Sequence, residues 1–161
     1  PGRPPLDLIP ITTPDNIALQ AKLTLPEPPE VGDSAPPPVV LYLHGAGART
    51  CDSPFPYRAE DGSVQWGNYL DFHAAELAPR GVAFCSVSKR GCTATDQPPF
   101  MAVDQDVFAT ATITAMLADY EAVLETLRAR TDVDASRVVL LGSSEGTRIA
   151  PPLAAPAPAG V

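Results

Sequence analysis

An apolar run that ends in Gly-Ser-Ser-Glu-Gly constrains this chain more than any other feature of its sequence. The run covers residues 138–141 and the five residues after it are 142–146. Continuous apolar runs are typical of strands covered on both faces. Glycines at both ends of 142–146 permit a turn that larger residues would block, and a helix is expected to begin after it. The sequence therefore predicts a buried strand that turns sharply into a helix, with Ser144 at the tip.

The rest of the chain predicts an α/β domain. Residues 39–43 and 82–87 are two more apolar runs, and helical segments are expected at 69–78 and 105–130. The second helix has an apolar stripe at helical spacing, and Asp119 lies off that stripe. Strands and helices that alternate in this way favour a parallel sheet with right-handed crossovers. At 161 residues, we expect one domain.

Two segments precede this alternation. Residues 17–25 alternate apolar side chains with smaller or polar ones, and the turn sequence Pro-Asp-Asn at 14–16 comes directly before them. This pattern predicts an antiparallel hairpin. Residues 26–38 hold six of the 20 prolines, so that stretch can form neither a helix nor a central strand. We expect 26–38 to be an exposed connecting loop.

Composition argues against several classes of function. The formal net charge of -8 disfavours nucleic-acid binding, which needs a basic face. No apolar run of about 18 residues is present, so no membrane span is expected. Three cysteines are too few for a disulfide framework. Cys85 is expected in the core, while Cys51 and Cys92 are expected in neighbouring loops, as thiols or as a disulfide. Both a cytoplasmic and a secreted location are compatible with this composition.

Ser144 is the candidate nucleophile of the chain. The predicted turn lifts its hydroxyl above the carboxyl end of a strand and places it at the start of a helix. Free amides and the helix dipole favour a developing negative charge there. A serine that acts as a nucleophile needs a histidine to take its proton and an acid to orient that histidine. The alternative is a serine that only caps the helix.

Taken together, the motifs resemble the N-terminal half of an α/β-hydrolase. The matching features are the turn at 14–16, His-Gly-Ala-Gly at 44–47, Arg-Gly at 90–91, the lead-in at 134–137 and the turn at 142–146, which is similar to the nucleophile elbow of that family. The chain is similar in style to the esterases and to the acyl-peptidase (S9-like) and dienelactone-hydrolase-like branches, over about residues 8–161. The resemblance implies an α/β-hydrolase sheet with an N-terminal antiparallel hairpin and parallel strands, truncated after the elbow.

The resemblance also implies roles for individual residues. Ser144 would attack the carbonyl of an ester or related acyl substrate, while the amides of Ala46 and Glu145 hold the oxyanion. His44 would brace its loop, with a role as catalytic base as the alternative; metal binding is not expected, because no second ligand stands at suitable spacing. Arg90 would fix the loop that lines the site, or be a solvated charge. The supporting positions are His44, Gly45, Gly47, Arg90, Gly91, Gly142 and Gly146.

Two departures from the family pattern matter. Members usually carry a large residue where Ser143 stands. Their acid and histidine follow the serine, but residues 147–161 contain no His, Asp or Glu, and His73 lies in the first predicted helix, away from the turn. We therefore predict a fragment of a larger enzyme, inactive alone, which needs a missing C-terminal half or a complementing chain. An inactive binding module and a serine peptidase are the alternatives.

Residues 49–68 form the last segment of interest. They include Phe55, Tyr57 and Trp66, and we expect a long loop that forms part of the substrate wall; a plain surface loop is the alternative. The Gly-Ala-Gly at 45–47 lacks the third glycine of a dinucleotide-binding turn. No cofactor is therefore expected.

Overall fold

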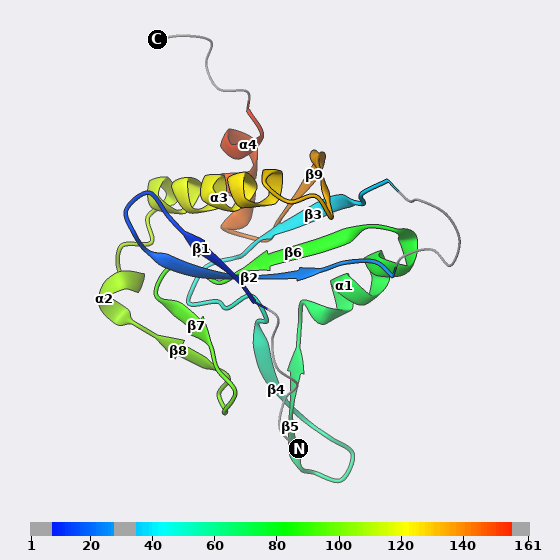
Figure 1. Ribbon diagram of the computed structural model, residues 1–161. Helices are drawn as coiled ribbons and strands as arrows, with labels where there is room; N and C mark the ends of the chain where they lie inside the picture. Colours follow the sequence, from blue (N-terminus) through cyan, green and yellow to red (C-terminus); the bar gives the residue numbers. More distant parts are fainter. Residues whose placement is uncertain (1–7, 28–34, 156–161) are drawn as a thin grey trace.

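A five-stranded mixed sheet forms the centre of the computed structural model, which describes residues 8–27 and 35–155 (Figure 1). The strand order is β1-β2-β6-β3-β9. β1 and β2 form an antiparallel hairpin, β2 is antiparallel to β6, and β3 is parallel to both β6 and β9. These strands are β1 Leu8–Thr12, β2 Ala18–Thr24, β3 Pro38–Leu43, β6 Ala83–Val87 and β9 Asp134–Gly142.

Helices cover both faces of the sheet (Figure 1). On one face α3 and α4 pack over Val39, Leu41 and Leu43 of β3. On the other face α1 packs over Val40 and Tyr42 of the same strand. Consecutive side chains of a strand point to opposite faces, so a strand covered on both sides must be apolar throughout. The helices are α1 Asp71–Leu77, with a 3-10 turn at Ala78–Arg80, then α2 Gln105–Phe108, α3 Ile113–Arg128 and α4 Gly146–Ala154.

The helix predicted at 105–130 is in fact two helices. α2 ends at Phe108 and α3 begins at Ile113. The break follows from side chains that bond to the backbone: the Thr112 hydroxyl accepts a hydrogen bond from the Ala115 amide (3.2 Å) as the cap of α3. The Thr110 hydroxyl donates to the Val107 carbonyl (2.7 Å). Threonine favours such caps over helix interiors.

Two small hairpins extend from the same side of the molecule (Figure 1). The first is formed by β4 Pro54–Arg58 and β5 Val64–Asn68, and the second by β7 Cys92–Ala94 and β8 Met101–Val103. The expectation of a long loop at 49–68 is therefore wrong for most of that segment. Its β4 strand carries two prolines, which is tolerated because the two-stranded ribbon consists only of edge strands.

β9 lies at an edge of the sheet, where β3 is its partner within the described residues. Val138 and Leu140 pack against the core beneath α3 and α4. The alternate side chains Val139 and Leu141 are 58% and 38% exposed. The prediction of a strand at this position is confirmed, and one of its faces is left largely open within the described residues.

Other expectations concern the connecting loop, the cysteines and the membrane. Residues 28–34 of the predicted connection lie outside the described residues, and Pro38 already belongs to β3. Cys85 is buried in β6, as predicted, and Cys92 is a buried thiol rather than half of a disulfide. Among the described residues, no helix has the length and apolar character that crossing a membrane requires.

Candidate active site

Ser144 lies at the tip of a sharp turn between β9 and α4, as the sequence predicts. Its backbone φ is +49°, a left-handed conformation that residues with a Cβ atom adopt rarely and at some cost. Two hydrogen bonds hold the turn on either side of it. The Ser143 amide donates to the Leu43 carbonyl of β3 (3.0 Å), and the Gly146 amide donates to the Ser143 carbonyl (2.8 Å). The strained residue is therefore fixed between two bonded neighbours.

The predicted glycines of this turn stand where there is no room for a Cβ atom. A Cβ atom at Gly146 would overlap the Leu43 carbonyl oxygen, and one at Gly142 would lie 2.7 Å from the Gly146 carbonyl carbon. A Cβ atom at Gly45 would lie 3.3 Å from the Cβ of Ser144. These glycines let the turn close and let the loop after β3 lie directly against Ser144.

His44 is buried at the start of that loop. Its side chain is among the largest fully buried ones, and its ring meets the Tyr42 ring edge-on at 5.1 Å between centroids. The His44 amide donates to the Tyr120 hydroxyl of α3 (3.2 Å). Burial, aided by the nearby charges of Lys89 and Arg49, lowers the pKa of His44 to about 3. His44 is therefore a neutral side chain anchored between β3 and α3.

Two backbone amides belong to the turn and to the loop that lies against it, those of Ala46 and Glu145. Ala46 follows Gly45 in the loop, whose next residue, Gly47, has φ +85°. Glu145 directly follows Ser144 and caps α4. Within the described residues, neither the Ala46 nor the Glu145 amide donates an intramolecular hydrogen bond. Both donors are therefore available to a ligand.

An ion pair that the sequence does not predict joins the turn to the loop after β6. Lys89 Nζ lies 2.6 Å from Glu145 Oε2, and the two side chains are 4% and 26% exposed. Lys89 stands beside the Arg-Gly motif, but its partner is 56 residues away. Spacing along the chain gives no signal for such a pair.

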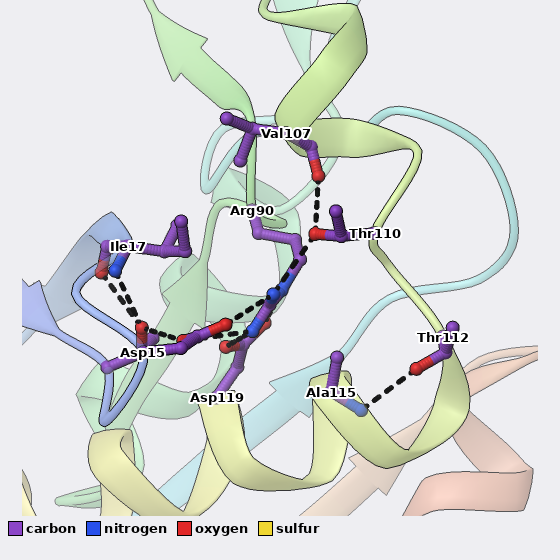
Figure 2. A network of polar contacts seen from close by, with 9 residues as sticks. Asp15, Ile17, Arg90, Val107, Thr110, Thr112, Ala115 and Asp119 are labelled. Atoms are coloured by element: carbon purple, nitrogen blue, oxygen red, sulfur yellow. Dashed lines mark hydrogen bonds and ion pairs between the residues drawn. The ribbon is translucent and has the colours of Figure 1, made fainter.

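Arg90 is the centre of a buried polar cluster that ties three elements together (Figure 2). Its Nε and Nη2 donate to the two carboxylate oxygens of Asp119 on α3 (2.9 and 2.6 Å). Its Nη1 donates to Asp15, in the β1–β2 turn (2.9 Å), and to the Thr110 hydroxyl (3.1 Å). The Arg90 side chain is only 3% exposed, and these bonds, those of Asp119 foremost, raise its pKa further.

This cluster resolves the two interpretations of Arg90 and corrects one expectation about α3. Arg90 is buried and bonded, so the solvated-charge interpretation is wrong. Asp119 lies off the apolar stripe in sequence, yet it is 5% exposed and faces Arg90. Gly91 has φ +74°, and a Cβ atom there would lie 2.6 Å from the Phe108 amide nitrogen. The Arg-Gly pair therefore lets the chain pass close beneath α2.

A cleft of about 720 Å³ opens beside Ser144. The loop after β3, Ser143 and Ser144 form one part of its lining, and the two hairpins contribute Phe55, Trp66, Pro99 and Met101. The Phe55 ring lies directly over Gly67, where a Cβ atom would be only 2.9 Å from Phe55 Cζ. The segment expected to form a substrate wall therefore lines this cleft, as a hairpin.

Neither histidine of the chain is bonded to Ser144. His73 lies on α1, where its ring packs against Tyr42 and Phe84 at 5.8 Å, and it is not part of the cleft lining. His44 Nε2 has no hydrogen-bond partner among the described residues. The described part of the chain thus presents Ser144 and two open amides without an imidazole bonded to the hydroxyl.

No protein-family model and no curated protein sequence matches the chain, but solved structures do. An esterase from Exiguobacterium antarcticum has a TM-score of 0.53 and 21% identity, over 88% of this chain and 37% of its own. An acetyl xylan esterase from Paenibacillus sp. R4 has a TM-score of 0.54 and 17% identity, over 89% and 42%. An epoxide hydrolase from Vigna radiata has a TM-score of 0.51 and 18% identity, over 92% and 34%.

These similarities show the fold that the motifs predicted. Because the identities are only 17 to 21%, these similarities concern the fold alone. The chain spans between 34% and 42% of the length of these three proteins. It has the α/β-hydrolase fold, in the form of its N-terminal half.

Proposed function

We propose that this chain carries the nucleophile and the oxyanion donors of a serine hydrolase that acts on carboxylic esters or related acyl compounds. The observation that carries the proposal is the φ of +49° at Ser144, at the tip of a strand-to-helix turn. Strain of this kind persists where the surrounding structure enforces it, and it gathers at active sites. The similarity in fold to an esterase and to an acetyl xylan esterase supports the same class.

In the proposed reaction, Ser144 Oγ attacks the carbonyl carbon of the bound ester. The carbonyl oxygen becomes negatively charged, and the free amides of Ala46 and Glu145 donate hydrogen bonds to it. The N-terminus of α4 adds a favourable dipole at the same place. Loss of one such donor typically costs about 100- to 1,000-fold in rate.

The base of the proposed reaction must come from other residues. A general base works best with a pKa near the operating pH, whereas the pKa of His44 is about 3 and its ring is buried. His73 packs within the aromatic group on the α1 face. We propose that a histidine and an acid reach Ser144 from a C-terminal half or from a complementing chain, and that these 161 residues alone turn over almost no substrate.

One alternative is favoured by a specific observation. Because no imidazole is bonded to Ser144 within the described residues, the chain also fits an inactive binding module that has kept the turn. A serine peptidase would use the same turn, amides and cleft. Esters remain the first choice because two of the similar structures are named as esterases.

Kinetics of the complete protein that contains this chain would test the proposal. We expect it to hydrolyse nitrophenyl esters faster than peptide anilides. Ser144→Ala should lower kcat by roughly 10⁴- to 10⁶-fold, as removal of a serine nucleophile does elsewhere. Ser143→Ala is the matched control and should stay within a few fold. An active enzyme that tolerates Ser144→Ala would overturn the proposal, and a protein without esterase or peptidase activity would favour the binding module.

A further inference from the structure

The charge on the cleft lining is concentrated in one side chain. The described lining residues are aromatic, aliphatic, small or hydroxyl-bearing, and Arg49 is the charged one among them. His44 also lines the cleft, but its pKa of about 3 leaves it neutral. The cleft therefore has an apolar and aromatic surface with a single positive charge.

Arg49 differs from the two other cations near the site. Lys89 is paired with Glu145 and Arg90 with Asp119. In the part of the chain that the structure describes, the Arg49 guanidinium forms no ion pair, although acidic residues outnumber Lys and Arg by 19 to 11. The Arg49 carbonyl accepts a hydrogen bond from the Lys89 amide (2.9 Å), which fixes its backbone beside the turn. Arg49 thus lines the cleft without an acidic partner among the described residues.

The β4–β5 hairpin supplies an apolar, aromatic part of the cleft lining. Trp66 lines the cleft, and its ring meets Phe100 edge-on at 5.4 Å. Phe55 is also a lining residue, but it pairs with Gly67, the neighbour of Trp66, and so belongs to the other face of the ribbon. Flat apolar surfaces of this kind favour a planar, apolar ligand group. A nearby low-dielectric wall also strengthens the attraction between a guanidinium and an anion.

We propose that this cleft binds acyl compounds that carry a free carboxylate together with a flat apolar group. The carboxylate pairs with Arg49, whose planar fork suits a carboxylate in two-point contact, and the apolar group lies against Trp66. The consequence for catalysis rests on the proposed function. If the cleft belongs to an esterase, the Arg49 contact selects esters that carry an anionic carboxylate remote from the scissile bond. The binding itself requires no hydroxyl at Ser144.

Calorimetric titration of the complete protein with phenylacetate and with phenylacetamide tests the proposal. The two probes share shape and ring but differ in charge. We expect phenylacetate to bind about tenfold more tightly, the range of one hydrogen-bonded charge. The preference should shrink as salt rises. Arg49→Gln should make the two probes equal, whereas Arg148→Gln, an exposed arginine of α4 outside the cleft, should leave the preference intact.

Two further measurements locate the ligand and separate this proposal from the reaction. Phenylacetate should quench the emission of Trp66, seen as the difference between the protein and its Trp66→Phe variant. Ser144→Ala should bind phenylacetate as well as the unaltered protein does, so loss of esterase activity cannot mimic loss of this site. Equal binding of both probes by the unaltered protein, no saturable binding, or a preference that survives Arg49→Gln would each overturn the proposal.

Discussion

Lys89 and Arg90 are adjacent in sequence, and their buried side chains serve different parts of the molecule. Arg90 makes five hydrogen bonds that reach the β1–β2 turn, the link between α2 and α3, and α3 itself. Lys89 makes one, to Glu145 beside Ser144. One cation therefore holds the scaffold, and its neighbour holds the turn at the candidate site. Both cations belong to the loop after β6. Two adjacent residues of this loop therefore connect the turn at the candidate site to the scaffold.

The two clusters also differ in how much water reaches them. The side chains of Arg90 and Asp119 are 3% and 8% exposed, while the side chain of Glu145 is 26% exposed. A charge left alone in a dry environment costs far more than one that water can still solvate. We therefore expect damage to the Arg90 cluster to lower the free energy of unfolding more than damage to the Lys89 pair does.

Removing the Asp119 carboxylate should have the largest effect. Asp119→Ala leaves the Arg90 guanidinium buried without its main partner, and the free energy of unfolding should fall by about 3–5 kcal/mol. Urea unfolding measures this change. Glu121→Ala is the matched control, because it removes an exposed carboxylate from the same helix and should cost less than about 0.5 kcal/mol. Equal losses in the two variants would contradict a special role for the Arg90 cluster.

Breaking the Lys89 pair should have a smaller, coupled effect. Lys89→Met should cost about 1–2 kcal/mol of unfolding free energy, since Glu145 keeps partial access to water. A double-mutant cycle with Glu145→Gln should give a coupling energy of about 1 kcal/mol. Strict additivity in the cycle would show that the two side chains do not stabilise each other.

A change at the tip of the turn should act in the opposite direction. Ser144→Gly removes the Cβ atom that makes φ +49° unfavourable and should raise the free energy of unfolding by up to about 1 kcal/mol. Ser143→Gly, whose backbone is outside the positive-φ region, should bring no such gain. Denaturant midpoints of both variants decide the question, and a loss in Ser144→Gly would mean that the turn is not strained in solution.

The smallest effect is expected at the exposed end of the Arg90 cluster. Hydrogen bonds from Thr13, and then from Arg90, lower the pKa of Asp15 below its ordinary value of 3.8. The unfolded chain therefore binds this proton at a higher pH than the folded chain does. The stabilising contribution of Asp15 is complete above about pH 4 and is lost as the pH falls through the lowered pKa. The urea midpoint measured as a function of pH should fall less steeply at acid pH in Asp15→Asn than in the unaltered protein. An unchanged slope would contradict the assignment.

The features that the sequence predicted well depend on local signals. The apolar runs of β3, β6 and β9, the β1–β2 hairpin and the glycine turn around Ser144 all follow from neighbouring residues. The likeness in fold to two esterases and an epoxide hydrolase agrees with the resemblance drawn from the same motifs. Such short-range patterns survive in the structure because the sheet requires them.

The features that were missed depend on partners far away in sequence or on competing local bonds. The pairing of Asp119 with Arg90 spans 29 residues, so helical periodicity placed Asp119 on the solvent side. The caps at Thr110 and Thr112 compete with an otherwise continuous helical pattern. The segment expected as a loop at 49–68 contains Pro54 and Pro56, which a two-stranded ribbon with free edges accepts.

The contact between Phe55 and Gly67 has a consequence for how the ligand range of this chain can diverge. Phe55 is among the residues that line the cleft, and its ring covers a residue without a side chain. An alanine or serine acquired at 67 would displace the Phe55 ring and change the shape of that part of the lining, while every lining residue keeps its identity. Position 67 therefore gives evolution, or a directed library, a single-codon means of reshaping the cleft.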